Sequence, residues 1–228
     1  MKRTMIVGVI FVFALMGCGK KSEGNKSVTQ GNGATAASNE AAVKPTEPQA
    51  VAGRNQFQPF PIYTDKGSHD NHYIPSGFMP DGKCLTIDDT WTKDCHDGKS
   101  CIKIVYDVAC SKQGQKWAGI YWQNPANNWG NRKGGFDLTG ANKLTFWVKG
   151  EKGGERIEEF KIGGVTGDYP DSDSAVIGPV ILTSEWRQYS IDLRGKDLSY
   201  ISGGFAWSTN VDVNQESCTF YLDDLKYE

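Results

Sequence analysis

The chain is poor in the residue patterns that catalysis and nucleic-acid binding usually need. Its 228 residues include three histidines, His69, His72 and His96, and carry a formal net charge of −2 at pH 7 with no block of basic residues. There is no G-x-S-x-G nucleophile motif and no CxxC pair. These absences argue against nucleic-acid binding and against the common nucleophilic hydrolases, so we expect a non-catalytic protein.

Long apolar runs are also absent, and the apolar stretch that exists is informative. Met5 to Met16 follows the basic start Met1-Lys2-Arg3 and ends at Gly17-Cys18. This stretch is too short to cross a bilayer as a stable helix. It resembles a bacterial lipoprotein signal, which implies cleavage before Cys18 and acylation of that cysteine. We expect an exported, lipid-anchored protein, in the outer membrane if the cell has two membranes; an ordinary secretory signal with a chance cysteine is the alternative.

The composition divides the rest of the chain in two. Residues 19–55 are rich in Gly, Ser, Ala, Asn and Lys, and they read as a disordered tether that would span on the order of 30 Å. All seven Trp and all nine Tyr lie beyond it. Residues 56–228 have the length of one domain. We therefore expect a signal over 1–18, a tether over 19–55 and one folded domain over 56–228.

Five cysteines follow Cys18, and export favours disulfides between them. Cys95 and Cys101 flank a turn-like stretch and are the pair we expect first; Cys84 with Cys110 is a second candidate pair. The odd number leaves at least one thiol free. A zinc site is the alternative, although only Cys95-His96 places the two ligand types together.

Short runs of alternating apolar and polar residues, separated by Gly, Asn and Asp, dominate the domain. No window shows a sustained helical period. The runs predict strands at about residues 102–108, 117–123, 144–148, 158–162, 176–182, 186–193, 203–208 and 219–227. Such a series predicts an all-β, two-sheet antiparallel sandwich.

Four sequence segments extend this expectation by their resemblance to a known fold. They are Gly135-Phe136-Asp137-Leu138-Thr139-Gly140, Lys143 to Gly150, Glu185 to Leu193 and Phe220 to Leu225. Together they resemble, over Gly98 to Glu228, galactose-binding-like jelly rolls found in carbohydrate-binding modules and in the complex I intermediate-associated protein family. The resemblance implies a jelly roll; it is much less specific for a ligand.

One stretch combines aromatic rings with amides, which suits sugar rings that have apolar faces and hydroxyl edges. This stretch predicts ligand contacts at Tyr121, Trp122, Asn124 and Trp129. The later strand at residues 144–148 adds Trp147. Glu159 and Lys161 are also predicted ligand contacts. Alternation places them on the strand face opposite Phe160 and Ile162, and the jelly-roll resemblance implies that this face is the concave one. The alternatives are core packing for the rings and simple solvation for the charges. Trp117 and Trp186 are predicted to be core residues.

A structural calcium ion is a further expectation. In the resembling folds the first and last strands are neighbours, and calcium often lies between an early loop and the last strand. The loop from Tyr63 to Asn71 offers oxygen ligands of the kind that calcium prefers. Asp65 and Asp223 are the predicted ligands; a plain turn and a solvated strand end are the alternative.

These observations lead to three functional hypotheses. The first is a lipid-anchored, non-catalytic module that binds a polysaccharide or glycan through stacked aromatic rings. The second is an envelope protein-interaction or assembly factor, whose aromatic face would dock a protein. The third is a glycan-degrading lyase or hydrolase, which would need a pair of carboxylates brought together across a sheet.

Overall fold

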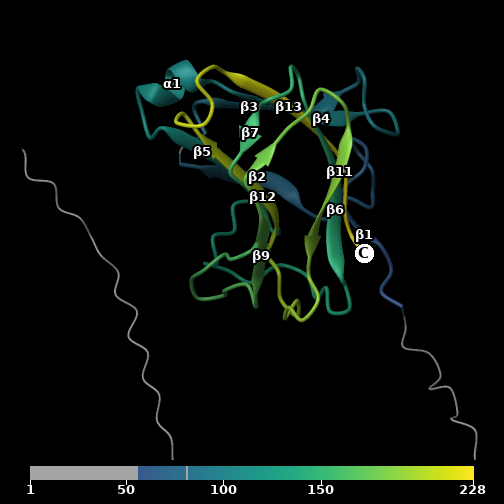
Figure 1. Ribbon diagram of the computed structural model, residues 1–228. Coiled ribbons are helices and arrows are strands. Elements are labelled where there is room, and N and C mark those ends of the chain that lie inside the picture. The colour runs from purple at the N-terminus through teal and green to yellow at the C-terminus, as the bar shows by residue number, and fades with distance from the viewer. Residues whose placement is uncertain (1–55, 81) are drawn as a thin grey trace, which may run out of the picture. The chain divides into compact units, whose positions relative to one another are not determined.

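The computed structural model describes residues 56–80 and 82–228, which belong to one compact unit (Figure 1). The signal, Cys18 and the predicted tether lie outside the described residues. Nearly all regular structure is β. None of the described helices is long and apolar enough to cross a membrane.

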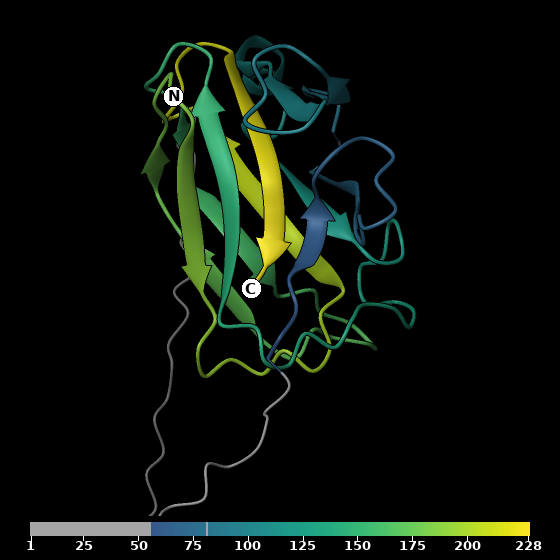
Figure 2. The same cartoon turned by 90° about the vertical axis from the view of Figure 1, so that its right-hand side faces the viewer.

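Two antiparallel sheets face each other. The first, sheet A, has the order β11 (Arg187–Asp192), β6 (Lys143–Gly150), β13 (Cys218–Tyr227), β4 (Cys101–Tyr106) and β3 (Leu85–Trp91), and β1 (Phe60–Tyr63) also pairs with β13. The second, sheet B, has the order β2 (Ile74–Met79), β5 (Trp117–Gln123), β12 (Gly203–Asn210), β8 (Glu159–Gly163) and β9 (Ser174–Ile177). Figure 2 shows β11, β6 and β13 side by side, with β1 beside β13.

Two smaller elements complete the chain. The strands β7 (Arg156–Ile157) and β10 (Val180–Ile181) form a two-stranded ladder. The helix α1 (Val108–Lys112) begins at Asp107, whose carboxylate accepts a hydrogen bond from the Cys110 amide.

The core lies between the sheets and is strongly aromatic. Phe146 of sheet A packs against Phe160 and Phe205 of sheet B, with ring centroids 4.8 Å and 5.3 Å away. Trp207 of sheet B meets Phe220 of sheet A edge to face at 4.9 Å. Each of these rings is essentially fully buried. Burying a side chain of this size stabilises the fold by about 2–3 kcal/mol, so these contacts fix how the sheets stack.

The all-β, two-sheet antiparallel prediction is confirmed. Most strands expected from residue 102 onward are found at nearly the predicted places, and β1 pairs with the last strand as the resemblance implied. The single strand predicted at 176–182 is instead two, β9 and β10, which belong to different sheets. The strands β1, β2 and β3 were not predicted: Pro and Gly interrupt the alternation of β1 and β2, and β3 has two adjacent aspartates at its centre. The helix α1 was also missed, since one turn of helix is too short to show a period.

Candidate binding site

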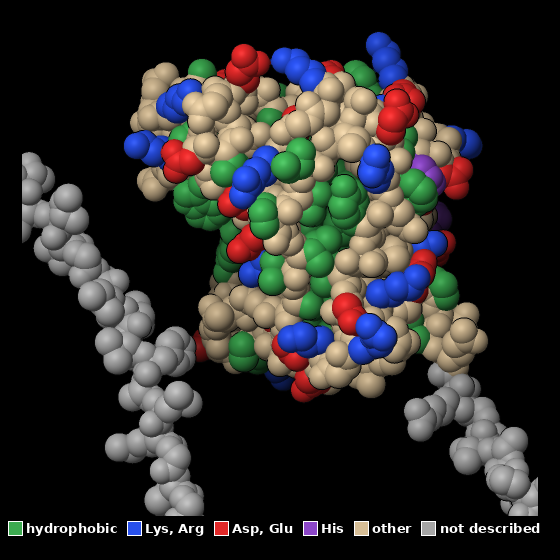
Figure 3. All heavy atoms as spheres, in the orientation of Figure 1, with side chains coloured by type: hydrophobic (Ala, Val, Ile, Leu, Met, Phe, Trp, Pro, Cys, Tyr) green, Lys and Arg blue, Asp and Glu red, His purple; other side chains and the backbone are tan. Residues whose placement is uncertain are grey.

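The outer face of sheet B carries a hollow that brings together three of the predicted contacts. It has a volume of about 170 Å³, and its lining includes Met79, Trp117, Tyr121, Glu159, Lys161, Ala206 and Ser208. We call it the sheet B groove. In Figure 3 the molecular outline is indented on the side of β5 and β12, below α1.

Strand register explains why these side chains meet. Tyr121 on β5 lies beside Ala206 on β12, and Ala206 lies beside Lys161 on β8. One step along the sheet, Ser208 lies between Gly119 and Glu159. Side chains that are cross-strand neighbours share one face of a sheet, so chain segments far apart in sequence form a single surface.

The hollow exists because the middle of that surface has almost no side chains. A Cβ atom at Gly119 would collide with the backbone oxygen of Trp207, and one at Gly77 would come within 2.8 Å of the Tyr121 Cβ. Ala206 adds only a methyl group. The larger side chains of Met79, Trp117 and Lys161 therefore surround a shallow depression, in which a flat ligand can approach the backbone of the sheet.

Aromatic rings and one ammonium group define the chemistry of the groove. Trp117, which lines the groove, is 39% exposed; Trp129, which is not among the lining residues, is 43% exposed. The ring of Trp129 meets Tyr121 edge to face, with centroids 5.9 Å apart. The Lys161 Nζ lies 5.4 Å from the Tyr121 centroid. The prediction that Trp117 is a core residue is wrong: it begins β5 at the edge of the packed region.

Tyr121 itself is held in place and neutral. Its hydroxyl donates a hydrogen bond to the Gly163 carbonyl oxygen at 3.1 Å. Burial raises the pKa of Tyr121, with hydrogen bonding to Lys161 acting in the opposite direction. The phenol therefore stays protonated at neutral pH, and because Tyr121 is only 5% exposed it forms the floor of the groove rather than an open platform.

Trp122 is not a ligand contact, which corrects the prediction for this residue. It points from β5 into the core, is 1% exposed, and packs edge to face on Phe205 at 5.4 Å. Neighbours along a strand point to opposite faces, so Tyr121 and Trp122 were never able to share one open surface. The alternation of Trp117, Gly119 and Tyr121 was the signal that would have identified Trp117 instead.

Asn124 is also corrected, because its amide is engaged inside the protein. The Oδ1 atom accepts a hydrogen bond from the Gly135 amide at 3.1 Å, and Nδ2 donates to the His72 carbonyl at 3.4 Å. The nearby Asn128 is fully buried and accepts from the Gly130 amide. These amides shape the loop that presents Trp129; they do not face a ligand.

Trp147 lies on the other sheet, which corrects its prediction as an open platform. It is on the outer face of β6 in sheet A, and the His96 imidazole covers its ring at a centroid distance of 3.7 Å. Trp186 lies nearby and donates a hydrogen bond from Nε1 to the Asp94 carbonyl at 3.0 Å. Trp186 is therefore a half-buried surface residue and not the core residue that was predicted.

The loop over Trp147 is fixed by a disulfide. Cys95 and Cys101 are bonded, as predicted, with Cα atoms 5.4 Å apart, and Cys84 is bonded to Cys110. The remaining described cysteine, Cys218, is a buried free thiol. In the described part of the chain, the one cluster of three potential metal ligands consists of Cys95, Cys101 and Asp223, and its sulfurs are in the disulfide.

Asp65 and Asp223 both bind the loop 95–101 through its backbone amides. The Asp65 Oδ1 accepts hydrogen bonds from the Lys99 and Ser100 amides, both at 2.7 Å. The Asp223 Oδ2 accepts from the His96 and Asp97 amides at 3.0 Å and 3.2 Å. These N–H donors engage Asp65 Oδ1 and Asp223 Oδ2, each of which already accepts two backbone hydrogen bonds. Both carboxylates are thus used in holding the loop, and calcium here stays a prediction without support from the geometry.

The two carboxylates differ in electrostatics. Backbone hydrogen bonds lower the pKa of Asp65, with the Lys99 amide contributing most. Asp223 is fully buried, and this burial raises its pKa to about 6 against the opposing effect of its amide donors. Each carboxylate therefore bonds to the loop 95–101, and through that loop the last strand is linked to the early loop. The resemblance implied an ion at this place.

Comparison with known proteins supports the fold. No protein-family model matches the chain, and no curated protein sequence matches it. A solved family 30 carbohydrate-binding module is 19% identical, covering 75% of this chain and 98% of that chain with a TM-score of 0.50. A family 30 module of a Clostridium thermocellum cellulosomal cellulase is 17% identical, covering 75% and 97%, with a TM-score of 0.46. A Clostridium thermocellum family 11 module, solved with a β-1,3-1,4-mixed-linked tetrasaccharide, is 14% identical, covering 63% and 81%, with a TM-score of 0.42. At these identities the likeness shows the jelly-roll fold and nothing finer.

Proposed function

We propose that this chain is a lipid-anchored, non-catalytic module that binds a polysaccharide or glycan in the sheet B groove. The observation that carries the proposal is the groove itself: exposed Trp117 beside Tyr121, with Lys161 and Glu159 on the same face. The family 30 module with which the chain shares its fold is a carbohydrate-binding module, which supports the same class of ligand.

The mechanism follows from the chemistry of a pyranose ring. Its C–H face would stack on the indole of Trp117, while its hydroxyls would bond to polar groups such as the Lys161 ammonium and the Glu159 carboxylate. Each aromatic contact would contribute roughly 1 kcal/mol. Affinity for one sugar would be weak, and a chain of sugars that meets several contacts would bind more tightly.

The proposal places the domain on a tether at a membrane surface. Acyl chains on Cys18 would anchor the chain on the exported side, in the outer membrane if the cell has two. The tether over residues 19–55 would let the groove reach glycan away from the lipid surface. The N-terminal lipoprotein-like motif supports this arrangement.

A binding experiment tests the proposal. The full chain with Cys18→Ser, which removes the acylation site, is applied to a glycan array and then titrated by calorimetry with the glycans it retains. Trp117→Ala should weaken binding about tenfold, equal to about 1.4 kcal/mol. Trp186→Ala, on the opposite sheet, is the matched control and should leave affinity unchanged. Absence of binding to every glycan overturns the proposal.

A further inference from the structure

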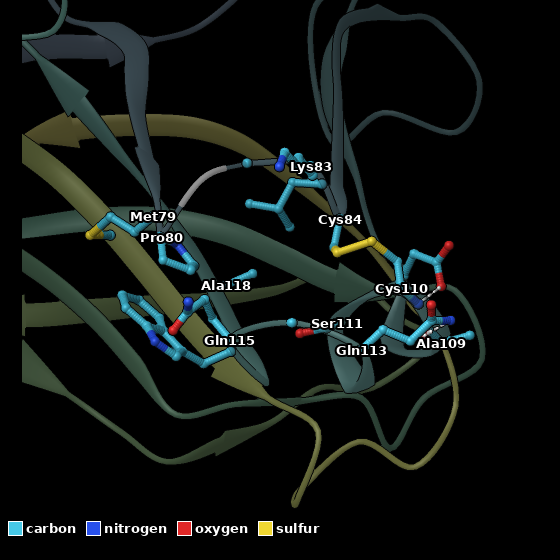
Figure 4. Close-up of a pocket in the computed structure, with 15 residues that line it drawn as sticks. Met79, Pro80, Lys83, Cys84, Ala109, Cys110, Ser111, Gln113, Gln115 and Ala118 are labelled. Atoms are coloured by element: carbon cyan, nitrogen blue, oxygen red, sulfur yellow. Dashed lines mark hydrogen bonds between the residues drawn. A yellow bond between two sulfur atoms is a disulfide. The ribbon is translucent and has the colours of Figure 1, made fainter.

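A second and larger hollow lies at the α1 end of the sheet B groove. Its volume is about 570 Å³. Met79 and Pro80 at the end of β2 form one side, and Ala109, Cys110 and Gln113 of α1 and its C-cap form the other. Figure 4 shows these residues facing each other across open space, with the Cys84–Cys110 disulfide on the α1 side. We call it the α1 pocket.

The walls of the α1 pocket are covalently and locally fixed. The Cys84–Cys110 disulfide joins the segment before β3 to the helix. The Asp107 amide donates a hydrogen bond to the Cys84 carbonyl at 2.9 Å, and the Lys116 amide donates to the Ser111 carbonyl at 3.1 Å. The α1 side of the pocket is therefore formed before a ligand arrives, so binding would not have to order that wall.

The α1 pocket and the sheet B groove adjoin each other. Met79 and Trp117 line both. Trp117 stands at the start of β5 and Tyr121 lies four residues further along, which is about 13 Å on an extended strand. A ligand that touches Tyr121 and also enters the α1 pocket must therefore be a chain of linked units.

Among the described residues, the charges along this path balance. Among its described lining residues, the α1 pocket has one cation, Lys83, and one anion, Asp107. The sheet B groove has Lys161 and Glu159. Among these residues a polyanionic glycan would meet as many like charges as opposite ones, whereas hydroxyl groups can bond to polar groups of either sign and to the amides of Gln113 and Gln115.

We infer that the α1 pocket is a second subsite of the sheet B groove, and that together they bind a neutral oligosaccharide chain that passes over Trp117. This inference rests on the proposed function, since it assumes a glycan in the groove. It adds the class of glycan, the direction in which the chain continues, and a role for the loop closed by Cys84–Cys110.

Filling the α1 pocket tests the inference. Ala109 is exposed on α1 and lines the pocket, so Ala109→Trp adds a bulky ring to the pocket without disturbing the core. The matched control is Gln188→Trp, an exposed position on β11 of sheet A. Both variants are made in the full chain with Cys18→Ser. The probes are cello-, xylo-, manno- and laminari-oligosaccharides of two to six units, together with the hexamer of galacturonic acid, and affinity is measured by calorimetry.

The expected result has three parts. Wild type binds at least one neutral hexasaccharide more tightly than the galacturonate hexamer. Ala109→Trp lowers the affinity for that hexasaccharide at least tenfold, and its affinity for the shortest bound oligomer stays within twofold of wild type. Gln188→Trp changes neither. If wild type binds but Ala109→Trp has no effect, or if the acidic hexamer binds best, this inference alone is overturned. If wild type binds none of the probes, the inference is overturned, and the glycan array then decides whether the proposed function falls with it.

Discussion

The imidazole of His96 stacks on the indole of Trp147, with ring centroids 3.7 Å apart and planes 18° apart. The His96 Nδ1 also lies 3.0 Å from the Asp224 Oδ2. The loop that carries His96 thereby covers the ring of Trp147 on sheet A, whereas Trp117 on sheet B stays 39% exposed. This contact removes one face of Trp147 from the surface on which a ligand could stack.

Removal of the His96 ring should loosen the loop over sheet A. His96→Ala is expected to lower the free energy of unfolding by about 1 kcal/mol, because the stack with Trp147 is lost. Chemical denaturation measures this change, and acrylamide quenching should report greater access to tryptophan. His69→Ala, at an exposed position, is the control. Equal stability of the two variants would show that the stack contributes nothing.

The loop that presents Trp129 depends on a glycine at its centre. Gly130 has φ +80°, and a Cβ atom there would collide with the Thr166 backbone oxygen. Gly67 has a similar φ of +77° with nothing within 4 Å of its Cβ position. Gly130→Ala should therefore destabilise the fold by about 2 kcal/mol more than Gly67→Ala. Urea denaturation of the pair separates the collision from backbone strain, and equal losses would contradict the argument.

Asp223 should make stability depend on pH. Its pKa is raised by burial to about 6, from 3.8 in the unfolded chain. Its protonated form therefore favours the folded state, an effect fully present below pH 3.8 and lost as pH rises through 6. Relative to Asp223→Asn, wild type should lose about 2 kcal/mol of unfolding free energy between pH 4 and pH 7. Denaturation curves in EGTA measure this difference, with exposed Asp168→Asn as the control; a difference that stays flat or rises with pH would contradict it.

The free thiol of Cys218 should be unreactive in the folded protein. Burial raises its pKa to about 12, so almost no thiolate forms at pH 8. In the Cys18→Ser chain, Ellman's reagent should detect no thiol in the native state and one after unfolding. Five should appear after reduction of both disulfides. A thiol that reacts in the native state would show that β13 opens or that a disulfide is broken.

Calcium should leave stability unchanged. Backbone amides already bond to one oxygen of Asp65 and one oxygen of Asp223, and they hold the loop without an ion. The thermal midpoint in 1 mM calcium chloride should therefore equal that in EGTA. A rise of several degrees in calcium, abolished by Asp65→Asn, would restore the calcium site that the resemblance implied.

Much of the fold followed from alternation along single strands. The runs containing Phe146, Phe160 and Phe220 were assigned to strands because apolar residues recur at every second position, and all three lie in the core. The pairing of Cys95 with Cys101 followed from their flanking a short turn. These features are local, so a stretch of a few residues contains the information that determines them.

The site was only partly predictable, because it is assembled from strands that the sequence does not order. Glu159 and Lys161 were placed on the correct face of their strand, yet their meeting with Tyr121 depends on β12 lying between β8 and β5. Trp147 was on an outward face as expected, but a loop some fifty residues earlier in the chain covers it.

The sequence by itself determined that this protein is a β sandwich and which side chains share a face within each strand, since the backbone pleat sets that period. Tertiary structure decided which sheet is open, which tryptophans are exposed and where the hollows lie. Those outcomes depend on register between distant strands and on loop closure, and both arise from packing of the whole domain.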